Sequence, residues 1–452
     1  MVNVVIGLIG LGIVVFFHEL GHLAAAKAVG IRVEAFSIGW GRKLISRQWG
    51  ETEYRLSVFP FGGYCKMRGE EMLSTALEQD SPTIPKEHGS FYAAQPWKRI
   101  LVVAAGPFMN VVFSVLVLSI VWFVGFTVQS FENRIILVSE YDQTVSEMPA
   151  DMAGLETGDR IVAIDGSPVE SYRDIQQSIV TRPNTELRLK VERRGQQRQL
   201  TVTPRLDSST GAGQIGIYPW IEPVVGSVRD GSGAHLAGLQ PGDRILAVNG
   251  QEVEHSIVLS QVLNEGRGPV ELLVQRQDGG REELRVTPSE RDNGDREIGV
   301  AFQSLSLPSP NLGPLGAVGR GFEETLRTTQ LYIRSLALLF SGVDLQQAVA
   351  GPVRITYLVG EVATEGFAVG FLDGVVALFN FLSLLSIALF IMNLLPIPAL
   401  DGGQILLFLF ELIVRKELSP KLVYRYQMVG TVLILSLIGF ALFSDILFLS
   451  GR

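Results

Sequence analysis

Residues 4–28 read VVIGLIGLGIVVFFHELGHLAAAKA, a long apolar run that carries His18, Glu19 and His22 in its second half. A helix needs roughly 20 predominantly apolar residues to cross a hydrocarbon core of about 30 Å. The run begins without a basic segment and contains these polar residues, which together disfavour a cleaved signal peptide. We therefore interpret it as a membrane-spanning helix with a polar site inside it.

Three further stretches, residues 100–126, 375–395 and 422–449, have a similar length and apolar character. The chain has 452 residues, 47% of them hydrophobic and 19% charged, whereas about a quarter of a soluble protein is charged. The sequence thus predicts a multi-pass α-helical membrane protein with four transmembrane helices in the lipid bilayer. The formal net charge of −8 argues against a nucleic-acid partner, and the single cysteine, Cys65, excludes an intramolecular disulfide framework.

The distribution of basic residues predicts the orientation. Lys and Arg cluster between the first two spans and again between the last two, so both of these loops are expected to be cytoplasmic. The long segment 127–370 and both termini then lie on the opposite side of the membrane. The basic residues of that segment do not contradict this orientation, because long translocated domains are largely exempt from the charge rule.

The long segment contains an internal repeat. Residues 153–166 read AGLETGDRIVAIDG and residues 237–250 read AGLQPGDRILAVNG. The alternating pattern predicts two β-rich copies of one domain, at 127–221 and 222–309, and the repeated block resembles the PDZ domain family. PDZ domains commonly bind an extended peptide as an added strand, but two rigid spacers or steric shields are an equally open interpretation.

Residues 310–373 follow the repeat and include an amphipathic stretch. Its apolar residues recur among Glu, Arg, Thr and Gln, which predicts a helix on the outer membrane surface or packed on the spans. An ordinary helix packed on the second repeat remains the alternative.

The polar group in the first span has the spacing of a metal site. On a helix, His18 and His22 project from one face and can share a zinc ion, while Glu19 stands where it can take a proton from an activated water. Ionisable side chains inside a span are costly and usually functional. Two histidines that only bond between helices would not explain the acid beside them.

A third ligand is expected from residues 393–403, which read NLLPIPALDGG. Two prolines and two glycines prevent a regular helix, and irregular backbone at membrane depth is tolerated only where protein or a water-filled cavity covers it. Asp401 is therefore a candidate carboxylate ligand, and Asn393 could donate an amide hydrogen bond to an oxyanion. An interfacial turn with a capping aspartate is the alternative on local chemistry alone.

Together, HExxH in the first span, NxxPxPxLDG at the end of the third and the tandem repeat between them resemble the site-2 protease family of intramembrane zinc metalloproteases. The resemblance covers essentially the whole chain. It implies that His18, His22 and Asp401 bind one Zn²⁺ per chain, that Glu19 is the catalytic acid and base, and that Asn393 lies near the substrate or transition state.

The resemblance also implies a substrate class and a cellular place. The expected substrates are single-pass membrane proteins already trimmed on the periplasmic side, such as an anti-sigma-E factor in envelope stress signalling, and remnant signal peptides. The PDZ pair would exclude untrimmed proteins. The chain is expected in the cell inner membrane, as a monomer, with its active site toward the cytoplasmic side.

The order of segments predicted along the chain is a first helix, a hairpin and loop, a second helix, the two PDZ domains, the amphipathic segment, a third helix, and a loop with the fourth helix: 1–30, 31–97, 98–126, 127–221, 222–309, 310–373, 374–402 and 403–452. The hairpin, at 52–68, dips into the membrane and receives substrate as a strand in the resembled family; a cytoplasmic hairpin without a catalytic role is the alternative. A rival function is a membrane-anchored PDZ binding or chaperone protein with a structural or vestigial metal site.

Overall fold

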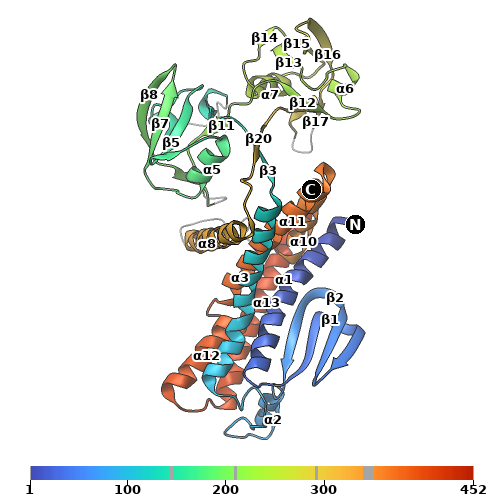
Figure 1. Ribbon diagram of the computed structural model, residues 1–452, viewed down its shortest axis with the longest axis vertical. Coiled ribbons are helices and arrows are strands. Elements are labelled where there is room, and N and C mark those ends of the chain that lie inside the picture. The colour runs from blue at the N-terminus through green and yellow to red at the C-terminus, as the bar shows by residue number, and fades with distance from the viewer. Residues whose placement is uncertain (1, 142–146, 208–210, 291–293, 340–350, 451–452) are drawn as a thin grey trace. The chain divides into compact units, whose positions relative to one another are not determined.

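The computed structural model describes residues 2–141, 147–207, 211–290, 294–339 and 351–450 (Figure 1). The chain divides into two compact units. One unit combines Met1–Phe126 with Ser309–Arg452, and the other is Thr127–Pro308.

The first unit is mainly helical. Within the described residues, four helices are long and apolar enough to cross a membrane, which equals the number of apolar stretches in the sequence. These four are α1 Val2–Ala28, α3 Pro96–Val124, α11 Phe371–Asn393 and α13 Pro420–Ser450. The same unit also contains α2 Met72–Glu78, α8 Pro314–Leu339, α10 Pro352–Val369 and α12 Asp401–Val414.

Helices α1, α3 and α11 form the centre of this unit (Figure 1). One apolar cluster packs Val14 of α1 against Phe113 and Val117 of α3 and Leu382 of α11. A second cluster begins farther along α1, at Leu23, and continues into α3, α12, α13 and the hairpin. The part of α1 between the two clusters is the part that carries the HExxH residues.

Helix α8 packs on α3 and α11, so the amphipathic segment lies against the spans. Ser114 of α3 and Thr325 of α8 place their hydroxyl oxygens 3.2 Å apart, and the Arg320 guanidinium lies over the Trp122 ring. Residues 340–350 of the predicted segment 310–373 lie outside the described part of the chain.

A long antiparallel hairpin runs beside α1 (Figure 1). It consists of β1 Val33–Trp49 and β2 Thr52–Met67, so it begins well before the predicted hairpin at 52–68. The first half of β1 pairs on both sides: Ala35 is the partner of Glu53 and also of Lys66. Both strands therefore fold back on themselves, and two chain segments build four rows of sheet.

The helix is interrupted between α11 and α12, where the prolines predicted an irregular segment. The residues after 402 were predicted as a loop, but the structure places α12 there. The glycines explain the difference, since a Cβ on Gly402 would lie 2.3 Å from the Leu394 carbonyl oxygen and one on Gly403 would lie 2.1 Å from that of Ile397. Without side chains, the broken segment can fold closely onto the first turn of a new helix.

The second unit contains two four-stranded antiparallel sheets with equivalent strand orders, β6-β5-β7-β8 and β14-β13-β15-β16. Each sheet has its own apolar core, one around Ile161 and Leu189 and the other around Ile245 and Leu272. The sequence repeat is thus a structural repeat. Its identity as a PDZ pair and the domain boundaries stay predictions.

The strands and helices of the repeats, in chain order, are β3 Thr127–Ser130, β4 Ile135–Leu137, η1 Val138–Glu140, α4 Pro149–Met152, β5 Arg160–Ile164, β6 Ser167–Pro168, α5 Tyr172–Val180, β7 Leu187–Arg193, β8 Gln196–Val202, β9 Arg205–Leu206, β10 Gly213–Gln214, β11 Ile217–Pro219, β12 Val225–Val228, α6 Gly233–Leu236, β13 Arg244–Val248, β14 Gln251–Glu252, α7 Ser256–Glu265, β15 Val270–Gln275, β16 Arg281–Val286, β17 Ser289–Glu290, β18 Arg296–Glu297, β19 Val300–Phe302 and β20 Leu305–Pro308. Strand β3 pairs with β20, so the two ends of this unit lie side by side.

Candidate metal centre

The structure brings together the three side chains predicted as metal ligands. Nε2 of His18 lies 3.2 Å from Nε2 of His22 and 3.2 Å from Oδ2 of Asp401, and Nε2 of His22 lies 3.7 Å from the same carboxylate oxygen. The two histidines are 9% and 8% exposed. Three potential ligand atoms therefore converge on one point inside the helical unit.

The spacing of these atoms fits a zinc ion. Zinc binds histidine nitrogen and carboxylate oxygen at about 2.0–2.2 Å in tetrahedral geometry, so two of its ligand atoms stand roughly 3.3 Å apart. The three observed separations, 3.2, 3.2 and 3.7 Å, lie close to that value. Two imidazoles and one carboxylate also form a donor set found in catalytic zinc sites, which leave a fourth position open.

Close packing of α3 against α1 shapes one side of the site. A Cβ on Gly21 of α1 would lie 2.2 Å from the Ala105 carbonyl oxygen. The backbones of α1 and α3 therefore approach each other more closely than a larger residue at this position would allow. On the facing helix, a Cβ on Gly106 would lie 2.3 Å from Nε2 of His22. Gly106 therefore leaves the space in which the two imidazoles stand.

Helix α3 also supplies the second hydrogen-bond partner of each histidine. His22 donates its Nδ1–H to the carbonyl oxygen of Val102, at 2.9 Å. The side-chain amide of Asn110 lies 3.1 Å from Nδ1 of His18. Asn110 was not predicted from the sequence, although an amide inside an apolar span was a signal that could have identified it.

Asp401 is the first residue of α12, where the helix dipole favours a negative charge. Tyr426 of α13 donates its hydroxyl hydrogen to the carbonyl oxygen of Gly403, at 2.9 Å. Farther along α12, Glu411 pairs with Arg99 of α3 at 2.6 Å, and both side chains are almost fully buried. These contacts fix the helix that presents Asp401, the predicted third ligand.

Glu19 faces the end of the hairpin. The backbone of Cys65 lies near the Glu19 carboxylate. A Cβ on Gly63 would lie 3.2 Å from Cγ of Glu19, so the strand passes the side chain at close range. Asn393 is the last residue of α11, before the break that leads to Asp401. Its role at the site stays a prediction.

Two titratable groups beside this strand lie outside the spans. Burial raises the pKa of the Cys65 thiol, and the charges of Glu19 and Glu70 raise it further. Burial also raises the pKa of Glu70, although the Met67 N–H donates to its carboxylate at 3.0 Å. The thiol therefore stays protonated and unreactive, consistent with a packing role.

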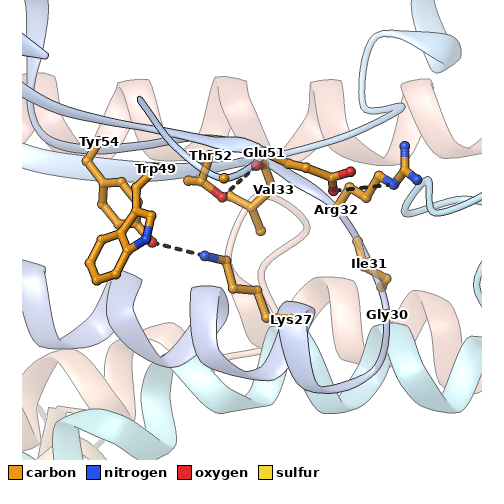
Figure 2. A pocket seen from close by; sticks show the side chains of 10 residues that line it. Lys27, Gly30, Ile31, Arg32, Val33, Trp49, Glu51, Thr52 and Tyr54 are labelled. Carbon is orange, nitrogen blue, oxygen red and sulfur yellow. Dashed lines mark hydrogen bonds and ion pairs between the residues drawn. The ribbon is translucent and has the colours of Figure 1, made fainter. Parts of the chain in front are cut away.

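A pocket of about 600 Å³ lies elsewhere, at the end of α1 and the base of the hairpin (Figure 2). Its two basic side chains already have partners: Lys27 donates to the Tyr54 hydroxyl at 2.9 Å, and Arg32 lies 3.4 Å from Glu51. None of the predicted site residues lines it. The chemistry of the metal centre is therefore not located in this pocket.

Comparisons with known proteins identify the family. The profile described as "Peptidase family M50" matches residues 6–437. The chain is 40% identical over 449 residues to the "Putative zinc metalloprotease" of Treponema pallidum (strain Nichols), covering 99% of this chain and 100% of that protein. It is 28% identical over 464 residues to the "Regulator of sigma-E protease RseP" of Escherichia coli (strain K12), covering 97% of each.

One solved structure that matches the chain covers a small part of it. The PDZ domain of the SdrC-like protein of Listeria innocua matches 18% of this chain and 93% of that domain, with 22% identity and a TM-score of 0.17. So low a TM-score decides nothing about the fold of the repeats. The family profile, in contrast, matches nearly the whole chain and confirms the resemblance to site-2 proteases. The chain is a zinc-dependent metalloprotease and belongs to peptidase family M50.

Proposed function

We propose that this protease hydrolyses peptide bonds within or beside the transmembrane helix of single-pass membrane proteins. The observation that carries the proposal is the position of the three ligand atoms, two of which belong to a helix long and apolar enough to cross a membrane. A hydrolytic centre at this level of α1 is suited to a bond that lies at membrane depth. A soluble substrate would first have to enter lipid.

The residues of the site divide the chemistry between them. His18, His22 and Asp401 would hold one zinc ion, whose Lewis acidity makes water nucleophilic near neutral pH and polarises a carbonyl group. Glu19 takes the proton from the attacking water and later delivers it to the leaving amine. Asn393 donates its amide hydrogen to the oxygen that becomes negative.

A substrate helix must unwind locally, because its carbonyl groups are engaged in internal hydrogen bonds. Pairing of the unwound segment with an edge of the hairpin would supply the extended conformation. The closeness of β2 to Glu19 supports this path, since a Cβ on Gly63 would lie only 3.2 Å from Cγ of Glu19.

The substrate class follows from the family resemblance and from one named relative. A relative called a regulator of sigma-E protease favours an anti-sigma-E factor, trimmed beforehand on the periplasmic side, as the kind of substrate. Remnant signal peptides belong to the same chemical class. In this proposal the protein is a monomer of the inner membrane, its termini and PDZ pair are periplasmic, and the pair excludes substrates that keep bulky domains.

Cleavage of a reporter transmembrane segment in proteoliposomes tests the proposal. We expect Glu19→Gln to lower the rate by about 10²–10⁴-fold, the usual contribution of a general base, while the variant keeps its zinc. Glu78→Gln, at an exposed position of α2, is the matched control and should cleave normally.

The same assay separates the rival function. A membrane-anchored binding or chaperone protein with a structural metal site would give no cleavage by the unchanged protein. Equal rates for the unchanged protein and Glu19→Gln would rule out the assigned mechanism.

A further inference from the structure

Asn110 lies in the middle of α3, with a relative exposure of 0%. Phe113 and Val117, on the following turn and the one after it, belong to an apolar cluster. A buried amide in such surroundings loses its hydration and requires hydrogen-bond partners. The partner that the structure supplies is Nδ1 of His18, 3.1 Å from the amide nitrogen of Asn110.

The direction of this hydrogen bond matters for metal binding. An amide N–H that donates to Nδ1 needs the lone pair of Nδ1, which leaves the proton of the neutral ring on Nε2. Nε2 of His18, however, is the atom that lies 3.2 Å from Asp401 and 3.2 Å from His22. A protonated Nε2 has no lone pair for a metal.

His22 shows the arrangement that metal binding needs. Its Nδ1 faces the carbonyl oxygen of Val102, and a carbonyl can only accept. The proton of His22 is therefore on Nδ1, and the lone pair of Nε2 faces Asp401. For His18 to match it, the group beside its Nδ1 must also be an acceptor.

Asn110 meets this condition when its amide is turned by 180°, which exchanges the oxygen and nitrogen without changing the shape of the group. The number of hydrogen bonds does not distinguish the two orientations. In the present orientation Oδ1 lacks a partner within the described structure, and after the turn Nδ2 would be the atom without one. The requirement for a lone pair on Nε2 does choose. We propose that Asn110 is a positioning residue whose amide oxygen accepts the Nδ1–H of His18 and so directs Nε2 to the metal.

The backbone of Asn110 is held as well. Ser386 of α11, also with 0% exposure, donates its hydroxyl hydrogen to the carbonyl oxygen of Asn110, at 2.9 Å. Asn110 is thus held through its side chain by the helix that carries the histidines and through its backbone by the helix that leads to Asp401. Outer partners of this kind orient ligand imidazoles and typically change metal affinity by about 10–100-fold when they are removed.

The inference rests on the proposed zinc site, and zinc affinity measured by chelator competition tests both separately. We compare the unchanged full-length protein with Asn110→Leu, which has no acceptor, and with Asn110→Asp, which keeps one. The control is Ser114→Ala, four residues along α3, which removes a buried hydroxyl that faces Thr325 rather than a histidine. We expect a roughly 10–100-fold weaker affinity for Asn110→Leu, with Asn110→Asp and Ser114→Ala close to the unchanged protein.

A spectroscopic measurement keeps the test independent of how well a variant folds. The chain has five histidines, so ¹⁵N labelling of histidine in the zinc-loaded, unchanged protein gives few signals. We expect a proton on Nδ1 of His18 with the shift of a hydrogen-bonded donor, and loss of that shift in Asn110→Leu. An unprotonated Nδ1, equal zinc affinity of the Leu and unchanged proteins, or equal losses for Leu and Asp would overturn the inference. Failure of the unchanged protein to bind zinc would instead reject the proposed function.

Discussion

Replacing Gly106 by alanine tests the metal centre where α3 approaches it most closely. An alanine Cβ would lie 2.3 Å from Nε2 of His22 and 2.9 Å from Nε2 of His18, whereas ordinary contact begins at 3.4 Å. The His22 ring must therefore retreat by about 1 Å, and metal–ligand distances in a working site hold within about 0.2 Å. A displaced ring cannot share an ion with Asp401.

The expected loss is confined to metal binding. The imidazoles are ends of side chains that can rotate, and alanine is favoured over glycine inside a helix by roughly 0.5–1 kcal/mol, so the metal-free fold should survive. A ligand present at a thousand times its Kd stabilises a protein by about 4 kcal/mol, and the variant should lack this contribution. The two proteins should therefore unfold at similar temperatures in chelator and differ only when zinc is added.

Metal analysis and thermal unfolding of the detergent-purified protein, with and without zinc, measure this effect. Gly439→Ala is the control, because a Cβ at that position of α13 meets nothing within 4 Å. One bound zinc and normal reporter cleavage in Gly106→Ala would refute the reasoning. An equal loss of stability with and without zinc would also contradict it, since α3 rather than the rings would then have moved.

Two further predictions concern charges away from the metal. Arg99→Met leaves the carboxylate of Glu411 buried without its partner, so we expect thermal unfolding to show a loss of about 3–5 kcal/mol that the double change to methionine largely restores; additive losses would argue against the pairing. Burial, with a smaller contribution from the charge of Arg134, lowers the pKa of His255 from 6.5 to about 4, and Glu222 opposes the shift. The unfolded chain thus binds the proton first as the pH falls below 6.5, and the second repeat should lose roughly 1–2 kcal/mol by pH 5. Hydrogen-exchange protection factors of residues 225–302 should fall between pH 7 and pH 5, and an equal fall in His255→Asn would contradict the assignment.

Much of the site could be predicted from local sequence. The i, i+4 spacing of His18 and His22 places both rings on one helix face wherever that helix sits, and the prolines before Asp401 break a helix in any context. These signals depend on the chain within one or two turns. The helix that begins at Asp401 was not predicted, because its start depends on how closely Leu394 approaches Gly402.

The rest of the site depends on contacts between helices that are distant in sequence. In the sequence, Gly106 is an ordinary small residue of an apolar span. Only the packing of α3 against α1 shows that its lack of a side chain leaves room for the two histidine rings. The sequence indicates that Asn110 needs a hydrogen-bond partner, since it is a polar amide in an apolar span, but it does not identify that partner. Double pairing of the first half of β1 was likewise hidden, because an alternating pattern does not reveal how many neighbours a strand has.

The proposed ligands of the metal centre lie far apart in the sequence, with both histidines in the first helix and the carboxylate at position 401. A ribosome adds about 5–20 residues per second, so the first helix exists for tens of seconds before its third ligand has been made. A nascent chain in the membrane, or one cut short before α12, has two ligands and no closed site. On this assignment, hydrolytic capacity arises only after residue 401 has been made, and unfinished copies of the enzyme that stop before it would leave neighbouring membrane proteins uncut.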